Sequence, residues 1–233
     1  MLSKWKTKHN SFLYIVNKNS FNINSKKAKH ICFAFLCLVL FAVTGCSSPS
    51  YYLENNKKRV ITGLERFLRH YADDYTNKTV LLVTNHSGVD YDLVPNIVLL
   101  RRKGINIKAI LAPEHGVYGH QNEYSKQLFH YDADYKIKIY NMHKLSTYRF
   151  KKIFKQVDAV IFDIQDLGMR CYTYISNLKQ IMDILNSMKT EFIVFDRPNP
   201  IGFIGENGAY LNQKFYSKYI SAFPAPFIYN MTM

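Results

Sequence analysis

The chain of 233 residues predicts an α/β fold, a mostly parallel sheet with flanking helices. One observation is that short apolar, strand-like runs alternate with segments whose apolar residues recur at helical spacing. This β-then-α order favours parallel strands joined by right-handed crossovers. The other observation is that four of the strand-like runs stop at a group of polar residues. Ligands of open parallel sheets bind beyond the carboxyl ends of the strands, so these four groups are expected to share one edge.

The predicted elements follow one another from residue 60. Residues 60–71 and 93–103 carry apolar side chains at helical spacing, and Gly104 stops the second segment. Ser146 is placed to cap the next helix. We predict helices at 60–71, 93–103, 146–156 and 174–188, and strands at 79–84, 105–112, 136–140, 159–163 and 192–196. Residues 117–135 are polar and irregular, which predicts a loop, and the alternation in 136–140 predicts a short edge strand.

The formal charge of +14 first suggests a nucleic-acid partner. However, residues 1–45 hold seven lysines and no carboxylate, and beyond them 24 basic residues face 17 acidic ones. The remaining lysines are scattered, without a basic helix that carries interleaved aromatic residues, which argues against nucleic-acid binding. The sequence also has no GxGxxG or P-loop pattern, so no nucleotide cofactor is expected.

The first 58 residues predict an exported lipoprotein. Lys26 to His30 is a positive segment, and the 13 residues 31–43 are apolar but too short to span a bilayer. The following Thr44-Gly45-Cys46 resembles the lipobox of bacterial lipoproteins, which implies cleavage before Cys46 and lipidation of its thiol. The alternative is a plain secretory signal with a chance cysteine. We therefore expect a leader at 1–45, whose first 25 residues suggest an overlong start, and a lipidated cysteine and tether at 46–58. One domain at 59–233 would then lie in the bacterial cell envelope, anchored to the membrane.

Cysteine usage agrees with this interpretation, because Cys171 would be the one thiol left beside Cys46 in the mature chain. An internal disulfide is then not expected. Cys171 has no obvious base beside it in the sequence, which favours a buried apolar thiol over a nucleophile.

Glu114 and His115 follow a predicted strand and lie between Pro113 and Gly116. Proline restricts the residue before it, and glycine permits a sharp turn. A carboxyl group presented in this way can act as a general acid if partial burial raises its pKa. The alternative is a loop glutamate paired with an arginine or lysine.

The other three polar groups offer hydrogen-bonding side chains and aromatic rings. They can bind sugar hydroxyls, and tyrosine rings are good platforms for sugars. The alternative is that these groups brace the fold. Asp163 or Gln165 would then bond Arg170, and the pair of Asp196 and Arg197 would hold the loop in which it lies. The candidates are Asn85, His86, Asp163, Gln165, Asp166, Arg170, Tyr172, Asp196 and Arg197. Three histidines lie near carboxylates in the sequence, but no HExxH or cysteine-pair spacing is present, so no metal site is expected.

Four motifs in order, TNHSGVD, APEHG, FDIQDLGMRCYTYIS and DRPNPIG, resemble the DUF1343 family, which includes exo-β-N-acetylmuramidases of the NamZ type. The resemblance spans about residues 79–232. It implies a Rossmann-like N-terminal domain, a smaller C-terminal domain, an active cleft between them, and removal of terminal N-acetylmuramic acid from peptidoglycan fragments. Carried over, Glu114 is the catalytic carboxylate and His115 its neighbour, while the pocket is lined by Asn85, Gln165, Arg170, Tyr172 and Asp196.

The sequence departs from the family pattern in three places. The stretch after APEHG reads VYGHQNE, the usual SLYG-like segment reads IYNMH, and the final family motif appears as Asn230-Met231-Thr232-Met233, where the sequence ends. We therefore expect the family's C-terminal domain to be missing from this chain and encoded separately or beyond a frameshift. The alternative function is a catalytically silent remnant or a sugar-binding envelope lipoprotein.

Overall fold

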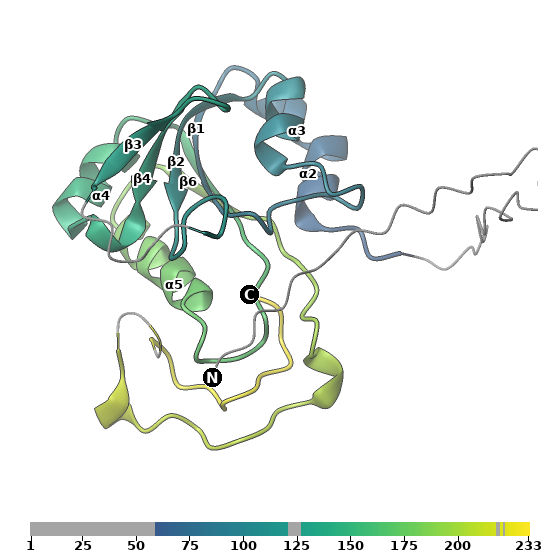
Figure 1. Cartoon of the computed structure of the whole chain (residues 1–233), viewed down its shortest axis with the longest axis vertical. Coiled ribbons are helices and arrows are strands. Elements are labelled where there is room, and N and C mark those ends of the chain that lie inside the picture. Colours follow the sequence, from purple (N-terminus) through teal and green to yellow (C-terminus); the bar gives the residue numbers. More distant parts are fainter. Residues whose placement is uncertain (1–58, 121–126, 218–219, 221) are drawn as a thin grey trace, which may run out of the picture. The chain divides into compact units, whose positions relative to one another are not determined.

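A six-stranded sheet with the order β3-β4-β2-β1-β5-β6 lies at the centre of the computed structural model (Figure 1). The structure describes residues 59–120, 127–217, 220 and 222–233, so the predicted leader, tether and Cys46 lie outside the described residues. The strands are β1 (Thr79–Thr84), β2 (Asn106–Ala112), β3 (Phe129–Asp132), β4 (Ile137–Asn141), β5 (Ala159–Asp163) and β6 (Glu191–Val194). All neighbouring pairs are parallel except β3 and β4, which confirms the predicted mostly parallel α/β fold.

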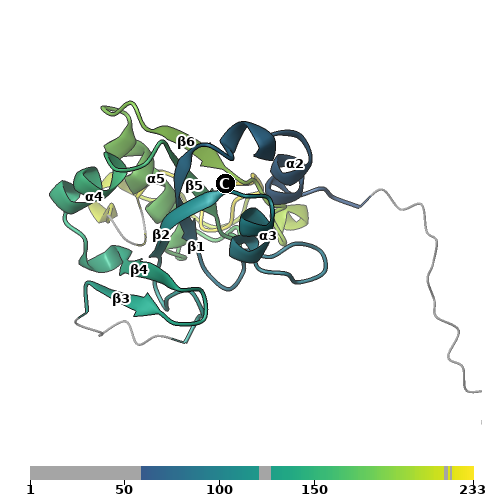
Figure 2. The ribbon, with the colours of Figure 1, turned by 90° about the horizontal axis from the view of Figure 1, so that it is seen from above.

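The helices cover both faces of the sheet. They are α2 (Gly63–His70), α3 (Asn96–Arg102), α4 (Thr147–Phe154) and α5 (Tyr174–Leu185), with short 3-10 helices η1 (Ala72–Tyr75), η2 (Met142–Lys144), η3 (Gly202–Ile204) and η4 (Gln213–Phe215). Figure 2 shows α2 and α3 on one side of the strands and α4 and α5 on the other. No helix within the described ranges is long and apolar enough to cross a membrane.

The central strand β1 explains the two layers of core, because successive side chains of a strand point to opposite faces. Val80 and Leu82 pack in the core that includes residues of α2 and α3, whereas Leu81 and Val83 pack in the core that includes residues of α4 and α5. All four side chains are fully buried. This continuous apolar run is expected for a parallel strand covered by helices on both faces.

Local capping sets where two helices begin. Thr62 and Glu65 form a reciprocal capping box at the start of α2, so that helix begins later than the apolar periodicity suggested. The Ser146 hydroxyl accepts a hydrogen bond from the backbone N–H of Arg149 at 3.4 Å, which confirms the predicted cap of α4.

Two expectations about the loop region and one about a cysteine were wrong. The predicted loop 117–135 contains β3, and β4 is not an edge strand because β3 pairs with its outer side. The four residues of β3 are mostly polar or exposed, so backbone pairing with β4 rather than an apolar pattern defines the strand. Cys171 is exposed, because it lies in the connection between β5 and α5, outside both cores.

Candidate functional site

The four polar groups singled out in the sequence meet at one edge of the sheet. The parallel register pairs Val83 of β1 with Leu111 of β2, and Thr84 of β1 with Asp163 of β5. Strand β6 runs parallel to β5, so its end lies at the same edge. The chain passes from β1 to β2 on one side and later returns to β5 on the other. The loops after β1 and β5 therefore flank a topological switch point, where open α/β sheets bind ligands.

A buried ion pair joins the ends of β5 and β6. The Arg197 Nε atom lies 2.6 Å from Asp163 Oδ1, and its Nη2 atom donates to Asp163 Oδ2 at 3.1 Å and to the carbonyl oxygen of Val89 at 2.9 Å. Asp163 is fully buried and Arg197 nearly so. Burial raises the pKa of Asp163, while the bonded Arg197 guanidinium and the Asn96 amide act in the opposite direction.

Asn96 extends this network, and the sequence analysis missed it. Its Nδ2 atom donates to Asp163 Oδ2 at 2.8 Å and to the Thr84 hydroxyl at 2.7 Å. Gly88 makes the arrangement possible, because a Cβ atom there would lie 2.3 Å from both Asn96 Nδ2 and Thr84 Oγ1. The HSG sequence after β1 was the available signal, since a glycine within a strand-end motif often marks close backbone approach.

A second set of bonds connects the loops after β1 and β5. Asn85 Oδ1 accepts from the Ser87 backbone N–H at 2.9 Å and from its hydroxyl at 2.6 Å, and the Ser87 hydroxyl accepts from the Gln165 backbone N–H at 2.9 Å. Because a backbone N–H can only donate, the Asn85 oxygen must face Ser87 and its amide nitrogen must face away. That nitrogen is buried and has no hydrogen-bond partner among the described residues.

Glu114 lies on a turn that its neighbours dictate. The Gly116 N–H donates to the Pro113 carbonyl at 3.1 Å, and both His115 (φ +67°) and Gly116 (φ +74°) have left-handed backbones. His115 is exposed and Glu114 is half-buried. Within the described part of the chain Glu114 makes no hydrogen bond or ion pair, so the loop ion pair considered as its alternative is not formed there.

Tyr174, the first residue of α5, belongs to the same region although the sequence analysis did not select it. Burial raises the pKa of its hydroxyl, Asn85 lowers it, and the charge of Glu114 raises it further. The Tyr174 hydroxyl therefore lies beside the Asn85 side chain and within electrostatic reach of Glu114. The signal was the tyrosine pair in CYTY, of which only Tyr172 was chosen; Tyr172 is 39% exposed.

Asp166 is buried in the loop after β5. One carboxylate oxygen accepts hydrogen bonds from the Gly168 N–H at 3.0 Å and from the Tyr229 hydroxyl, while the other oxygen is buried without a partner in the described chain. Burial, followed by the bond to Asp166, raises the pKa of Tyr229. Tyr229 thus fastens the segment near residue 230 to the sheet edge.

Three further candidates hold the segment after β6 in place. The Gln165 amide nitrogen donates to the carbonyl oxygens of Asp166 at 2.7 Å and Pro198 at 2.8 Å. The Arg170 guanidinium donates to the carbonyl oxygens of Ala209, at 3.0 Å, and Ala225. The third candidate is Asp196, whose carboxylate accepts hydrogen bonds from the Arg197 backbone N–H and the Thr232 hydroxyl, both at 3.0 Å.

A pocket of about 370 Å³ opens beside Asn85. His86 lines it and packs against Gly119, where a Cβ atom would lie 2.5 Å from the imidazole Nδ1 atom. Tyr118 and Tyr135 also line it, and their rings stack with centroids 5.9 Å apart. Across the described residues, no group of three histidine, cysteine, aspartate or glutamate side chains is placed to hold a metal ion.

Comparison with known proteins identifies the relatives of this sheet and its edge. Residues 80–233 match the family described as "Exo-beta-N-acetylmuramidase NamZ, N-terminal". The chain belongs to the NamZ family. The peptidoglycan beta-N-acetylmuramidase NamZ of Bacillus subtilis (strain 168) is 31% identical over 206 residues, which cover 86% of this chain and 50% of that protein.

Two solved DUF1343 family proteins of Bacteroides fragilis NCTC 9343 share the fold of this NamZ family chain. One has a TM-score of 0.63 at 32% identity and covers 73% of this chain and 43% of its own. The other has a TM-score of 0.60 at 28% identity and covers 75% and 44%. The chain thus spans about half the length of the curated relative and less than half of each solved relative.

Proposed function

We propose that this chain carries the acid-bearing half of an exo-acting glycosidase that removes terminal N-acetylmuramic acid from peptidoglycan fragments. Membership of the NamZ family supports a muramidase-like function, and the name of the Bacillus subtilis relative supports a peptidoglycan-derived substrate. The proposal itself adds which glycosidic bond is cleaved, that cleavage occurs at the chain end, and which residues take part.

The observation that carries the proposal is the state of Glu114. It is half-buried at the carboxyl edge of the sheet and makes no hydrogen bond or ion pair with the described residues. A half-buried carboxylate that braces a fold is normally paired, because removing charge from water is costly. Glu114 would donate its proton to the glycosidic oxygen as the leaving group departs, which is the role of a general acid.

The neighbouring groups would hold the sugar. The unpartnered Asn85 amide nitrogen offers one donor to a hydroxyl or carbonyl oxygen of the substrate. His86, His115 and Tyr172 are exposed at the same edge and would contact the sugar from solvent. Gln165, Arg170, Asp196 and the Asp163–Arg197 pair would act one step away, by holding the loops that carry these contacts.

The test is release of a chromogenic leaving group from an N-acetylmuramic acid glycoside. It should be run with the chain alone and with the second half of a NamZ family protein added, because the chain spans about half of its relatives. Release that depends on Glu114 is the expected result. Binding of the glycoside without hydrolysis in both arms would instead favour a sugar-binding protein, and neither binding nor hydrolysis would overturn both functions.

We also propose that the protein is a lipoprotein of the bacterial cell envelope, anchored through Cys46. The support is the ordered positive segment, apolar segment and small residues before Cys46 in the sequence. Cys46→Ala should release the protein from the membrane fraction or leave its precursor uncleaved. Normally processed protein that stays in the membrane fraction after this substitution would contradict lipidation.

A further inference from the structure

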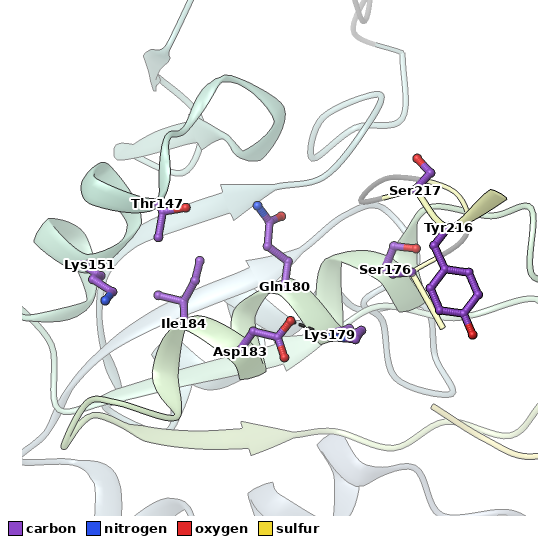
Figure 3. Close-up of a pocket in the computed structure, with 10 residues that line it drawn as sticks. Thr147, Lys151, Ser176, Lys179, Gln180, Asp183, Ile184, Tyr216 and Ser217 are labelled. Atoms are coloured by element: carbon purple, nitrogen blue, oxygen red, sulfur yellow. Dashed lines mark hydrogen bonds and ion pairs between the residues drawn. The ribbon is translucent and has the colours of Figure 1, made fainter. Parts of the chain in front are cut away.

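A second pocket, of about 430 Å³, lies between α4, α5 and the chain near residue 216, and Glu114 is not among the residues that line it. Figure 3 shows the side chains that line it. Five of them come from α5 at positions 176, 179, 180, 183 and 184. This spacing of three, four, seven and eight residues places them on one face of the helix. The pocket is therefore built along a helix face rather than at a loop.

The floor of the pocket holds a buried hydroxyl with no partner. Ser176 is 1% exposed, and its Oγ atom makes no hydrogen bond within the described chain. In Figure 3 this hydroxyl is turned toward the segment that carries Tyr216 and Ser217. Burying a hydroxyl without a bond costs free energy, so an orphaned group of this kind needs an explanation. A ligand oxygen or N–H in the pocket would supply the missing bond.

The remaining lining mixes polar groups with the apolar side chains of Ile184 and Ala222, and it carries one excess positive charge. Lys179 and Asp183 form an ion pair of 2.6 Å, so their charges offset each other. Lys151 of α4 also lines the pocket and makes no ion pair in the described ranges. The Gln180 amide offers both a donor and an acceptor, and the Tyr216 ring, 39% exposed, offers an apolar face.

We propose that this pocket is a second saccharide site, which binds an amino sugar bearing one carboxylate. An aromatic face beside amide and hydroxyl groups suits the CH surface and hydroxyls of a sugar. Lys151 adds a charge that a carboxylate would meet. The proposal rests on the proposed function, because N-acetylmuramic acid is N-acetylglucosamine with an added lactyl carboxylate. The site would then hold a sugar unit of a fragment at a distance from the reacting bond.

The experiment is titration of the full chain, labelled with nitrogen-15, with N-acetylmuramic acid and separately with N-acetylglucosamine. The signals followed are the Gln180 side-chain amide and the backbone amides of Ser176 and Lys179, with those of His115 and Gly116 as reporters of the Glu114 turn. We expect saturable shifts at the α5 signals, with tighter binding of the acidic sugar. The two sites are thereby separated, and no hydrolysis is needed.

Two variants assign the contacts. Ser176→Ala should weaken the binding of both sugars by roughly threefold to tenfold, which is the equivalent of one neutral hydrogen bond. It should not lower the thermal midpoint, because it removes a buried group that has no partner. Lys151→Gln should remove the preference for the acidic sugar, roughly twofold to fivefold for a partly exposed charge. The matched control is Lys152→Gln, an exposed neighbour on α4 that does not line the pocket.

The outcomes separate this proposal from the proposed function. Absence of shifts at the α5 signals would overturn the second site even if the Glu114 turn responds or hydrolysis is observed. Equal binding of the two sugars, or an unchanged preference in Lys151→Gln, would overturn its acidic specificity. Shifts at α5 in the unchanged chain, together with no hydrolysis by that chain with or without the second half of a NamZ family protein, would retain the site and reject the proposed enzyme.

Discussion

Two polar regions at the same edge of the sheet look alike in the sequence and differ in the structure. On one side, Asp163 is fully buried and both of its carboxylate oxygens are bonded, by Arg197 and Asn96. On the other side, Glu114 has no such partner among the described residues, and the Asn85 amide nitrogen is unpaired. Both regions are polar groups that follow an apolar strand.

The difference shows how one edge can serve stability and binding together. A buried polar group with all its bonds made fixes the loops that meet there, and removing one partner leaves an expensive unpaired charge. A buried polar group without partners costs folding free energy, and a ligand that bonds it would recover that cost. The buried bonds on the β5–β6 side therefore fix the loops as a frame, and the groups left without partners on the β1–β2 side are the ones to which the proposed function assigns the chemistry.

The largest effect is expected from Glu114→Gln. If Glu114 is the general acid, the substitution should lower the rate of glycoside hydrolysis by about 10²- to 10⁴-fold, because the amide keeps the shape and loses the proton. The free energy of unfolding should change by less than about 0.5 kcal/mol, because no described bond is lost. Activity assays and chemical denaturation measure the two quantities.

Glu206→Gln is the matched control for this split. Glu206 is exposed, and its carboxylate accepts a hydrogen bond from the Tyr210 hydroxyl at 2.9 Å. Its substitution should leave the hydrolysis rate unchanged. Equal rates for Glu114→Gln and the unchanged chain would remove Glu114 from the mechanism.

Arg197→Met should have the opposite pattern from Glu114→Gln, with its main effect on the free energy of unfolding. It leaves Asp163 buried without its cation, which typically costs about 3–5 kcal/mol of stability. Arg66→Met, at an exposed position of α2, is the control and should cost less than about 0.5 kcal/mol. Adding Asp163→Asn to Arg197→Met should recover part of the loss. A cost below about 1 kcal/mol for Arg197→Met would show that the pair does not hold the frame.

Much of this fold could be predicted from the sequence, because the central strands are covered on both faces and therefore read as apolar runs. The runs that became β1, β2 and β5 are apolar and end in buried residues, while β6 is apolar after Glu191 but only partly buried, and their parallel order followed from the helices between them. Strand β3 could not be predicted, since its residues are mostly exposed and its identity depends on pairing with β4.

The sequence predicted which residues gather at this edge, but not which of them are paired in the fold and which are left without a partner. The order of the strands sufficed to bring Asn85, Glu114 and Asp163 to one edge. Which carboxylate is paired depends on long-range partners: Arg197 lies 34 positions from Asp163, and Asn96 lies 67 positions away. Local spacing carries no information about such contacts, so the CYTY and HSG motifs could point to the region of Tyr174 and Asn96 but not to their partners.

Gly88→Ala tests how tightly the frame is closed. The added methyl group would lie 2.3 Å from Asn96 Nδ2 and Thr84 Oγ1, so the network around Asp163 must shift. We expect a loss of about 1–3 kcal/mol, the usual cost of overpacking. Gly205→Ala is the comparison for steric contact, because its Cβ would meet nothing within 4 Å and its cost, about 1–3 kcal/mol, would come only from a backbone conformation (φ +76°, ψ −173°) that favours glycine. Stability in Gly88→Ala equal to that of the unchanged chain would mean that the network yields easily.

The smallest effect is expected at the opposite end of the sheet, where Glu191 begins β6. Its carboxylate accepts hydrogen bonds from the Tyr75 hydroxyl and from Lys78, the latter at 3.1 Å, but the side chain is 46% exposed. Partial burial acts to raise the pKa of Glu191, yet the bonds from Tyr75 and Lys78 together lower it below the ordinary value of 4.5. A lowered pKa means that the folded state favours the ionised carboxylate.

Glu191→Gln should therefore cost less than about 1 kcal/mol at neutral pH, as exposed ion pairs usually do. The stabilisation is fully present above the unfolded-state pKa and is lost as the pH falls through the lowered folded-state pKa. Denaturation curves of the variant and the unchanged chain should thus differ slightly at pH 7 and converge in acid below the ordinary value of 4.5. A difference that grows on acidification would show that burial, rather than the bonds from Tyr75 and Lys78, controls this carboxylate. The exposed pair of Glu191 and Lys78 would then resemble the buried pair of Asp163 and Arg197, where burial raises the pKa of the carboxyl group.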